Sequence, residues 1–201
     1  MDLAVVAIAF GAIFLVELPD KTFVAALVLS TRYRPFAVWV GVGLAFLVQT
    51  AIACTVGGLV TLLPHTLVEV VAGLIFLAGA ILLLREAPKA DAAEAETEEE
   101  YAAKASAPKA GLAAVGASFV VLFAAEWGDL SQLLTISLVG RYHDAWSVFV
   151  GAWSALLVVS GLACVAGRLL LRHMRLSTIH YVGAGVCFLL ALLTAYQIVS
   201  G

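Results

Sequence analysis

Glu17-Leu18-Pro19-Asp20-Lys21-Thr22 has a similar counterpart 109 residues later, Glu126-Trp127-Gly128-Asp129-Leu130-Ser131. Both segments lie within long apolar runs. In each segment the two acids stand three residues apart, and a hydroxyl side chain follows two residues after the second acid. An acid at the centre of a membrane helix costs about 2.5–3.5 kcal/mol on insertion scales. A pattern so costly, present twice, predicts two related halves of a membrane protein that share a polar site.

The repeat extends outward from these two segments over nearly the whole chain. At offsets of 109 to 112 residues, the matching pairs are Arg32-Tyr33 with Arg141-Tyr142, Gly41 with Gly151, Cys54 with Cys164, Gly57 with Gly167, Ala72-Gly73 with Ala184-Gly185, and Phe76-Leu77 with Phe188-Leu189. Each half holds three apolar runs, and an odd number of spans gives the halves opposite orientations. Inverted repeats are a recurrent plan of secondary transporters, whose site lies near the bilayer midplane.

The composition excludes a soluble domain. Of the 201 residues, 63% are hydrophobic and 12% are charged, whereas soluble domains average about 45–50% apolar and 25% charged residues. Six runs are long enough to span a bilayer as helices: about 3–29, 36–62, 66–84, 111–140, 146–170 and 178–199. We therefore predict an all-α integral membrane protein with six transmembrane helices arranged as two inverted three-helix repeats.

An acidic linker joins the two predicted repeats, which comprise residues 1–84 and 111–201. The linker, residues 85–110, is expected to be partly helical or disordered, and seven of the 14 acids lie between Glu86 and Glu100. The loops after spans 1, 3 and 5 hold nine Lys and Arg residues, whereas the opposite side holds only Arg141. The positive-inside rule places those loops, including the linker, in the cytoplasm and both termini outside. No basic patch indicates a nucleic-acid partner.

The candidate site consists of the four motif acids, Glu17, Asp20, Glu126 and Asp129. Spacing of i and i+3 places the two acids of each motif on one helix face, and the repeat symmetry can bring the two pairs together. Supporting residues are the neutral oxygens of Thr22, Ser131 and Gln132, the base Lys21, and the helix-breaking Pro19 and Gly128. Such an oxygen cage suits hard divalent cations, Ca²⁺, Mn²⁺ or Mg²⁺.

The same carboxylates can carry protons. Crowded acids cannot all stay ionised without a cation, so cation binding would expel protons, which predicts a cation/proton exchanger. A structural alternative is buried pairing of the acids with Lys21 or Arg residues. Glu69, near the outer end of span 3, either lines an access path or reaches the membrane interface. The four histidines are expected at the interfaces: His65, His143, His173 and His180.

The two motifs resemble the hallmark of the Golgi transmembrane-protein-165-like cation/proton exchangers. Their hallmark is two copies of Glu-x-Gly-Asp-(Lys/Arg)-(Thr/Ser), on the first and fourth spans of a six-span core. The resemblance implies transport of Mn²⁺ or Ca²⁺ against protons, with the motif acids as ligands. Two positions depart from the hallmark: Pro19 replaces the first Gly, and Leu130 replaces the second basic residue. The second change leaves the site more negative.

The leading hypothesis is a Mn²⁺ exporter in a bacterial plasma membrane, driven by inward proton flow, with the lipid bilayer, the cation and protons as its partners and no resident cofactor. The preference for Mn²⁺ over Ca²⁺ comes from the resemblance and not from the ligand types. Three alternatives stay open at this point: an exporter of another cation or an amino acid of the lysine-exporter type, an intramembrane metal-dependent enzyme, and a channel. The enzyme is disfavoured because nothing marks a general base beside a metal.

Overall fold

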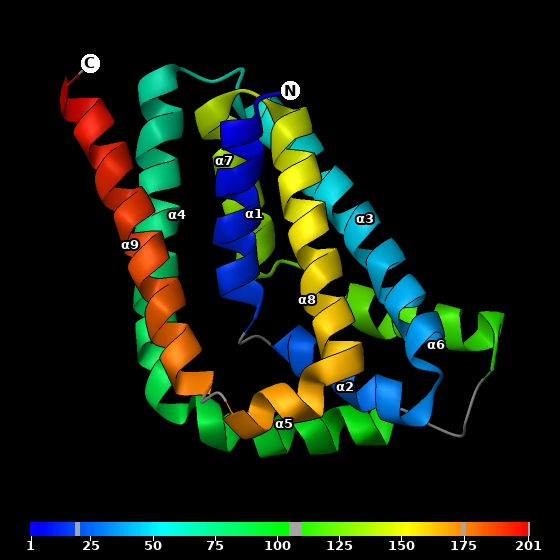
Figure 1. The fold of residues 1–201 in the computed structure, drawn as a ribbon. Helices are drawn as coiled ribbons and strands as arrows, with labels where there is room; N and C mark the ends of the chain where they lie inside the picture. Colours follow the sequence, from blue (N-terminus) through cyan, green and yellow to red (C-terminus); the bar gives the residue numbers. More distant parts are fainter. Residues whose placement is uncertain (19–20, 105–109, 174–175, 201) are drawn as a thin grey trace.

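Every element of the computed structural model is helical within the residues that it describes, 1–18, 21–104, 110–173 and 176–200 (Figure 1). The helices are α1 (Leu3–Glu17), α2 (Lys21–Arg32), α3 (Pro35–Val60), α4 (His65–Glu86), the short 3-10 helix η1 (Ala87–Lys89), α5 (Ala90–Lys104), α6 (Leu112–Ala125), α7 (Leu130–Tyr142), α8 (Ala145–His173) and α9 (Leu176–Ser200). The predicted all-α class is confirmed for these residues.

Two predicted spans are broken helices. The run predicted at 3–29 forms α1 and α2, which are bent by 70° relative to each other, and the run predicted at 111–140 forms α6 and α7, bent by 73°. Each break falls at one of the two acidic motifs. The sequence predicted such breaks at Pro19 and Gly128, although Pro19 itself lies outside the described residues.

The number of spans is supported only in part. Three helices are long and apolar enough to cross a membrane, namely Pro35–Val60, Thr66–Lys89 and Ala145–Val165, and the described residues give up to five spans when each bent pair counts as one. The sixth predicted run lies within α9, a helix of 25 residues that includes the apolar segment His180–Tyr196.

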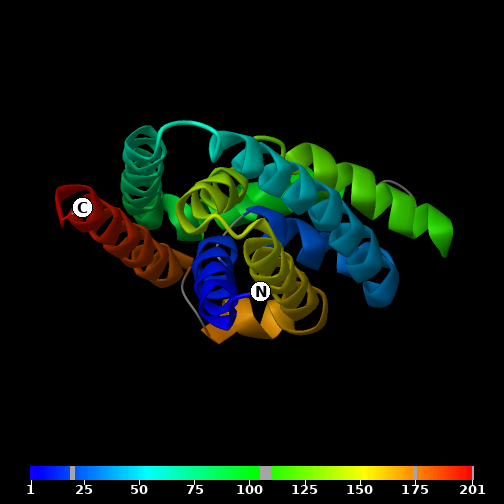
Figure 2. The ribbon, with the colours of Figure 1, turned by 90° about the horizontal axis from the view of Figure 1, so that it is seen from above.

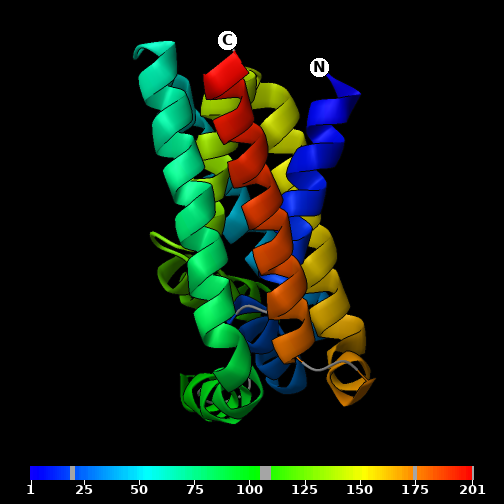
Figure 3. The same cartoon turned by 90° about the vertical axis from the view of Figure 1, so that its left-hand side faces the viewer.

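Helices from the two halves pack against each other. In this arrangement α1 lies against α8 and α3 lies against α6, while α4 and α9 run side by side (Figure 3). Seen from the end where α1 begins, α7 lies among α1, α3, α4 and α8 (Figure 2). The core therefore lies between the halves, and α7 passes through it.

Two glycines permit the closest of these contacts. A Cβ at Gly41 of α3 would come within 2.3 Å of the Val115 carbonyl oxygen in α6, and a Cβ at Gly151 of α8 would come within 2.5 Å of the Val6 carbonyl oxygen in α1. Both helix pairs thus approach backbone to backbone, as small residues allow in membrane proteins. Gly41 and Gly151 are one of the pairs matched in the sequence repeat, and Val6 and Val115 differ by 109 residues.

The acidic linker is helical where the structure describes it. After η1, α5 packs against α2, with the Tyr101 side chain buried and the acids Glu96, Glu98, Glu99 and Glu100 exposed. The α5 helix lies at the end of the molecule opposite to the start of α1 and the end of α9 (Figure 1). We call the end that carries α5 the linker side.

Candidate functional site

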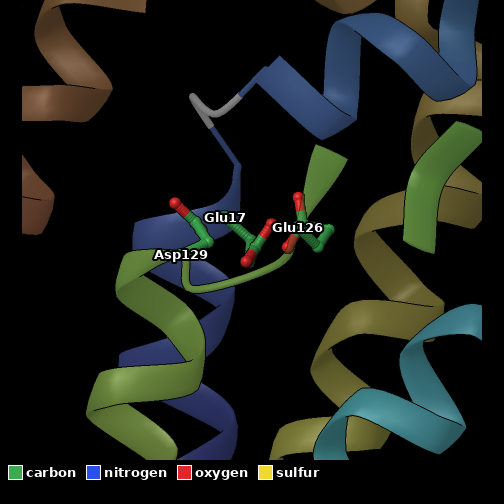
Figure 4. Close-up of side chains that lie close together, drawn as sticks. All are labelled: Glu17, Glu126 and Asp129. Carbon is green, nitrogen blue, oxygen red and sulfur yellow. The ribbon is translucent and has the colours of Figure 1, made fainter. Parts of the chain in front are cut away.

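Three of the four motif acids meet at the two helix breaks. Glu17, Glu126 and Asp129 each offer a carboxylate oxygen, and these oxygens lie within 4.8 Å of one another (Figure 4). Glu17 and Glu126 are buried, at 0% and 2% exposed, and Asp129 is half-buried. We call these three residues the carboxylate cluster. Asp20, the fourth acid of the prediction, lies outside the described residues.

The breaks themselves place the acids. Glu17 is the last residue of α1, Glu126 follows the last residue of α6, and Asp129 precedes the first residue of α7. Between the last two, Gly128 has a φ of +81°, a left-handed conformation that a residue with a Cβ adopts at a cost of about 1 kcal/mol. The chain bends by 73° between α6 and α7 at this turn, and Glu126 and Asp129 on its two sides both lie close to Glu17.

Polar side chains from both motifs support the turn and the cluster. The Thr22 hydroxyl donates a hydrogen bond of 2.9 Å to Glu17 Oε2, and the Gly128 N–H donates one of 3.1 Å to Gln132 Oε1. Thr22 and Ser131 are buried, and the Ser131 hydroxyl lies beside Glu17. Thr22 and Ser131 thus adjoin Glu17, whereas Gln132 supports the turn at Gly128.

Two carboxylate oxygens of the cluster are buried without a hydrogen bond. Glu17 Oε1 and Asp129 Oδ2 accept none from any described residue. An ionised carboxylate that is buried without donors is strongly disfavoured, and it is stabilised by a proton or by a bound cation. Each of these oxygens can therefore take up a proton or a cation.

Two of the other predicted residues lie apart from the cluster. Lys21 is exposed at the start of α2 and faces the linker helix. In that helix the Lys104 ammonium donates a hydrogen bond of 2.6 Å to Glu100 and holds the pKa of Glu100 below its ordinary value. Lys21 contributes to this lower pKa to a smaller extent. Glu69 is half-buried in the second turn of α4 and does not belong to the carboxylate cluster.

The histidines differ in their surroundings. His143 is exposed at the end of α7, whereas His180 of α9 is buried at 7% exposed. The side chains of His65 and His173 lie outside the described residues. The sequence placed all four at the membrane interfaces and gave no indication that His180 is enclosed by other helices.

Gln49 is a functional candidate that the sequence analysis missed. Its side chain is 3% exposed, and its Nε2 donates a hydrogen bond of 2.9 Å to the Phe123 carbonyl oxygen near the end of α6. Because α6 ends two residues later, that carbonyl has no partner along the helix. Gln49 stabilises the broken end that carries Glu126. The feature of the sequence that could have identified Gln49 is an amide side chain within an apolar run, which is uncommon in a membrane helix.

Comparisons with known proteins agree with this chemistry. The sequence signature described as "Divalent cation/proton antiporter GDT1" matches residues 5–91 and 114–201. A GDT1-like protein of Synechocystis is 31% identical over 186 residues, which cover 89% of this chain and 90% of that protein. A Vibrio cholerae protein described as a candidate manganese exporter is 33% identical over 200 residues, covering 96% of this chain and 92% of the relative. No solved structure matches the chain.

Proposed function

The chain belongs to the GDT1 family of divalent cation/proton antiporters, which are transport proteins and not enzymes, and from this premise we propose that it exports Mn²⁺ in exchange for protons. The carboxylate cluster is the proposed binding site, with Asp20 as a fourth ligand supplied by the first motif. The cargo is a substrate and not a resident cofactor.

One observation carries the proposal: three acids meet at two helix breaks, and two of their buried oxygens accept no hydrogen bond from any residue that the structure describes. Protonated carboxyls are tolerated in such a place, and so are carboxylates that coordinate a cation. The two states exclude each other at the shared oxygens, because a proton on an oxygen removes its charge and occupies a lone pair. Binding of a cation therefore requires release of protons, and this obligatory competition couples the two flows.

Alternating access would follow from two inverted three-helix halves, residues 1–84 and 111–201, with six spans in all. The supporting observations are the two bends of 70° and 73° and the equivalent contacts of Gly41 with Val115 and of Gly151 with Val6. Equivalent contacts allow the halves to exchange conformations at little net cost, since one half can adopt the arrangement that the other gives up. The linker side is the proposed cytoplasmic face, in the plasma membrane of a bacterium.

The choice of Mn²⁺ over Ca²⁺ is supported by the description of the Vibrio cholerae relative as a candidate manganese exporter. The cluster itself offers only oxygen ligands, which suit both ions. The matched family favours a divalent cation over the amino acid that a lysine-exporter type of protein would carry.

The test uses purified full-length protein in liposomes that contain a Mn²⁺-sensitive dye. We expect Mn²⁺ flux that a pH gradient accelerates and that moves protons in the opposite direction. Glu17→Gln should remove both flows, and Glu98→Gln, an identical change on the exposed face of α5, should remove neither. Mn²⁺ flux that moves no protons would indicate a channel or uniporter and would refute the exchange. Absence of Mn²⁺ flux with robust Ca²⁺ flux would refute the choice of ion.

A further inference from the structure

A cavity of about 230 Å³ lies next to the carboxylate cluster. Its walls come from α1, α4, the break between α6 and α7, α7 itself, and α9. Glu86, the last residue of α4, and His180, in the second turn of α9, both line it. The volume far exceeds the roughly 10–15 Å³ that one water needs when measured with a water-sized probe, so the cavity has room for an ion with bound water.

Among the described residues, the cavity is apolar apart from three ionisable side chains. These are Glu86, His180 and Asp129, and the remaining side chains of its wall are valine and leucine, with the backbone of Gly128 between them. Glu86 is exposed, His180 is 7% exposed, and Asp129 has a buried oxygen without a hydrogen bond. Ionisable groups placed within a membrane bundle mark ion pathways.

Asp129 belongs both to the cavity wall and to the carboxylate cluster. An ion that enters the cavity thus meets a ligand that is also part of the inner site. Glu86 and His180 are not members of the cluster, so they are positioned to act on the ion before it reaches Glu17 and Glu126.

We infer that the cavity lined by Glu86, His180 and Asp129 is a loading site that selects first-row transition-metal dications over Ca²⁺ and Mg²⁺ on the linker side. This inference rests on the proposed transport function for its cargo. The selecting group is the imidazole, because Ca²⁺ and Mg²⁺ prefer oxygen ligands whereas imidazole binds first-row transition metals. The inner cluster, with oxygens alone, does not distinguish Mn²⁺ from Ca²⁺. Selection therefore takes place in the cavity, and proton exchange takes place at the cluster.

The direct test detects the imidazole on the metal. In a Glu17→Gln, Glu126→Gln double variant the inner site is disabled, and Mn²⁺ bound to the purified full chain should show coupling to nitrogen in pulsed electron paramagnetic resonance. Adding His180→Gln should abolish that coupling. Adding His143→Asn should leave it intact, because His143 is exposed at the end of α7 and Asn tolerates its left-handed conformation. Bound Mn²⁺ without nitrogen coupling, coupling that persists without His180, or no Mn²⁺ binding at all would each overturn the loading site.

A second measurement distinguishes a role of His180 in ion selection from a role in supporting the fold. In liposomes with Mn²⁺ supplied from the linker side, His180→Gln should raise the half-saturating Mn²⁺ concentration about tenfold, the size of effect common for changes around metal sites. In the same variant, Ca²⁺ should inhibit Mn²⁺ transport at least as strongly as in the wild type, because its own binding is not weakened. Ca²⁺ would then compete better relative to Mn²⁺. An equal loss of affinity for both ions would mean that His180 only supports the fold, and would refute selection.

Glu86→Gln keeps the test decisive if the His180 variant does not fold, because Glu86 is exposed. It should weaken Mn²⁺ binding in the double variant while the nitrogen coupling remains, and unchanged binding would refute the role of Glu86. The resonance experiment does not depend on flux. Failure of the proposed function would appear as wild-type protein without proton-coupled Mn²⁺ transport, whereas failure of the loading site would appear as bound Mn²⁺ without a nitrogen ligand.

Discussion

The Thr22 hydroxyl donates a 2.9 Å hydrogen bond to Glu17 Oε2, while Glu17 Oε1 on the same carboxylate is buried and accepts none within the described part of the chain. One oxygen is thus held in place while the other is available to a proton or a metal ion. The first motif supplies both partners, the acid from the last residue of α1 and the hydroxyl from the first turn of α2. The break between the helices brings them together.

Thr22→Val should weaken Mn²⁺ binding about tenfold, because partners that orient a metal ligand typically contribute 10–100-fold to affinity. Valine has nearly the shape of threonine but cannot donate to Glu17. Thr22→Ser keeps the donor and should bind like the wild type. Titration calorimetry on the three proteins measures the effect, and a Val variant with wild-type affinity would show that the hydrogen bond does not orient the ligand.

Asp129→Asn should abolish Mn²⁺ transport while the protein still inserts into the membrane. The change keeps the size of the side chain and removes a charged ligand. Asn is also as good as Asp before the first residue of a helix, which is the position of Asp129 in α7, so the fold should persist. Growth of cells in toxic Mn²⁺, at matched protein abundance, reports transport. Cells that tolerate Mn²⁺ equally well with either residue would contradict the assignment of Asp129.

Mn²⁺ binding should release protons, and its affinity should fall as the pH falls. The cause is competition between protons and the metal for the same carboxylate oxygens. Calorimetry in buffers that differ in ionisation enthalpy counts the protons released per bound ion. A count of zero across the neutral range, with affinity independent of pH, would leave a cation site without exchange.

Gly41→Ala should lower the thermal midpoint in detergent. The new Cβ would come within 2.3 Å of the Val115 carbonyl oxygen, so α3 and α6 must move apart, at a cost of about 1–3 kcal/mol for overpacking. Gly58 lies in the same helix, and nothing lies within 4 Å of a Cβ placed there. Gly58→Ala should therefore keep or raise the midpoint. Equal midpoints for the two variants would show that the α3–α6 contact can adjust freely.

The sequence alone was sufficient to predict the helical class and the positions of both breaks. Apolar runs of this length have few alternatives to helices in lipid, because every backbone polar group must find its partner within the chain. The last predicted span, for example, lies within α9, which is helical over 25 residues.

Local spacing in the sequence defines the chemistry of each break, which consists of two acids, a hydroxyl and a helix-breaking residue. Which of these groups meet depends on how the helices pack. Glu17 joins Glu126 and Asp129, the Gln49 amide stabilises the end of α6, and His180 shares a cavity with Glu86. These contacts join residues 74 or more positions apart in the chain. Sequence periodicity tells which residues share a face of one helix, but the face that packs against another helix depends on how the side chains of both fit together.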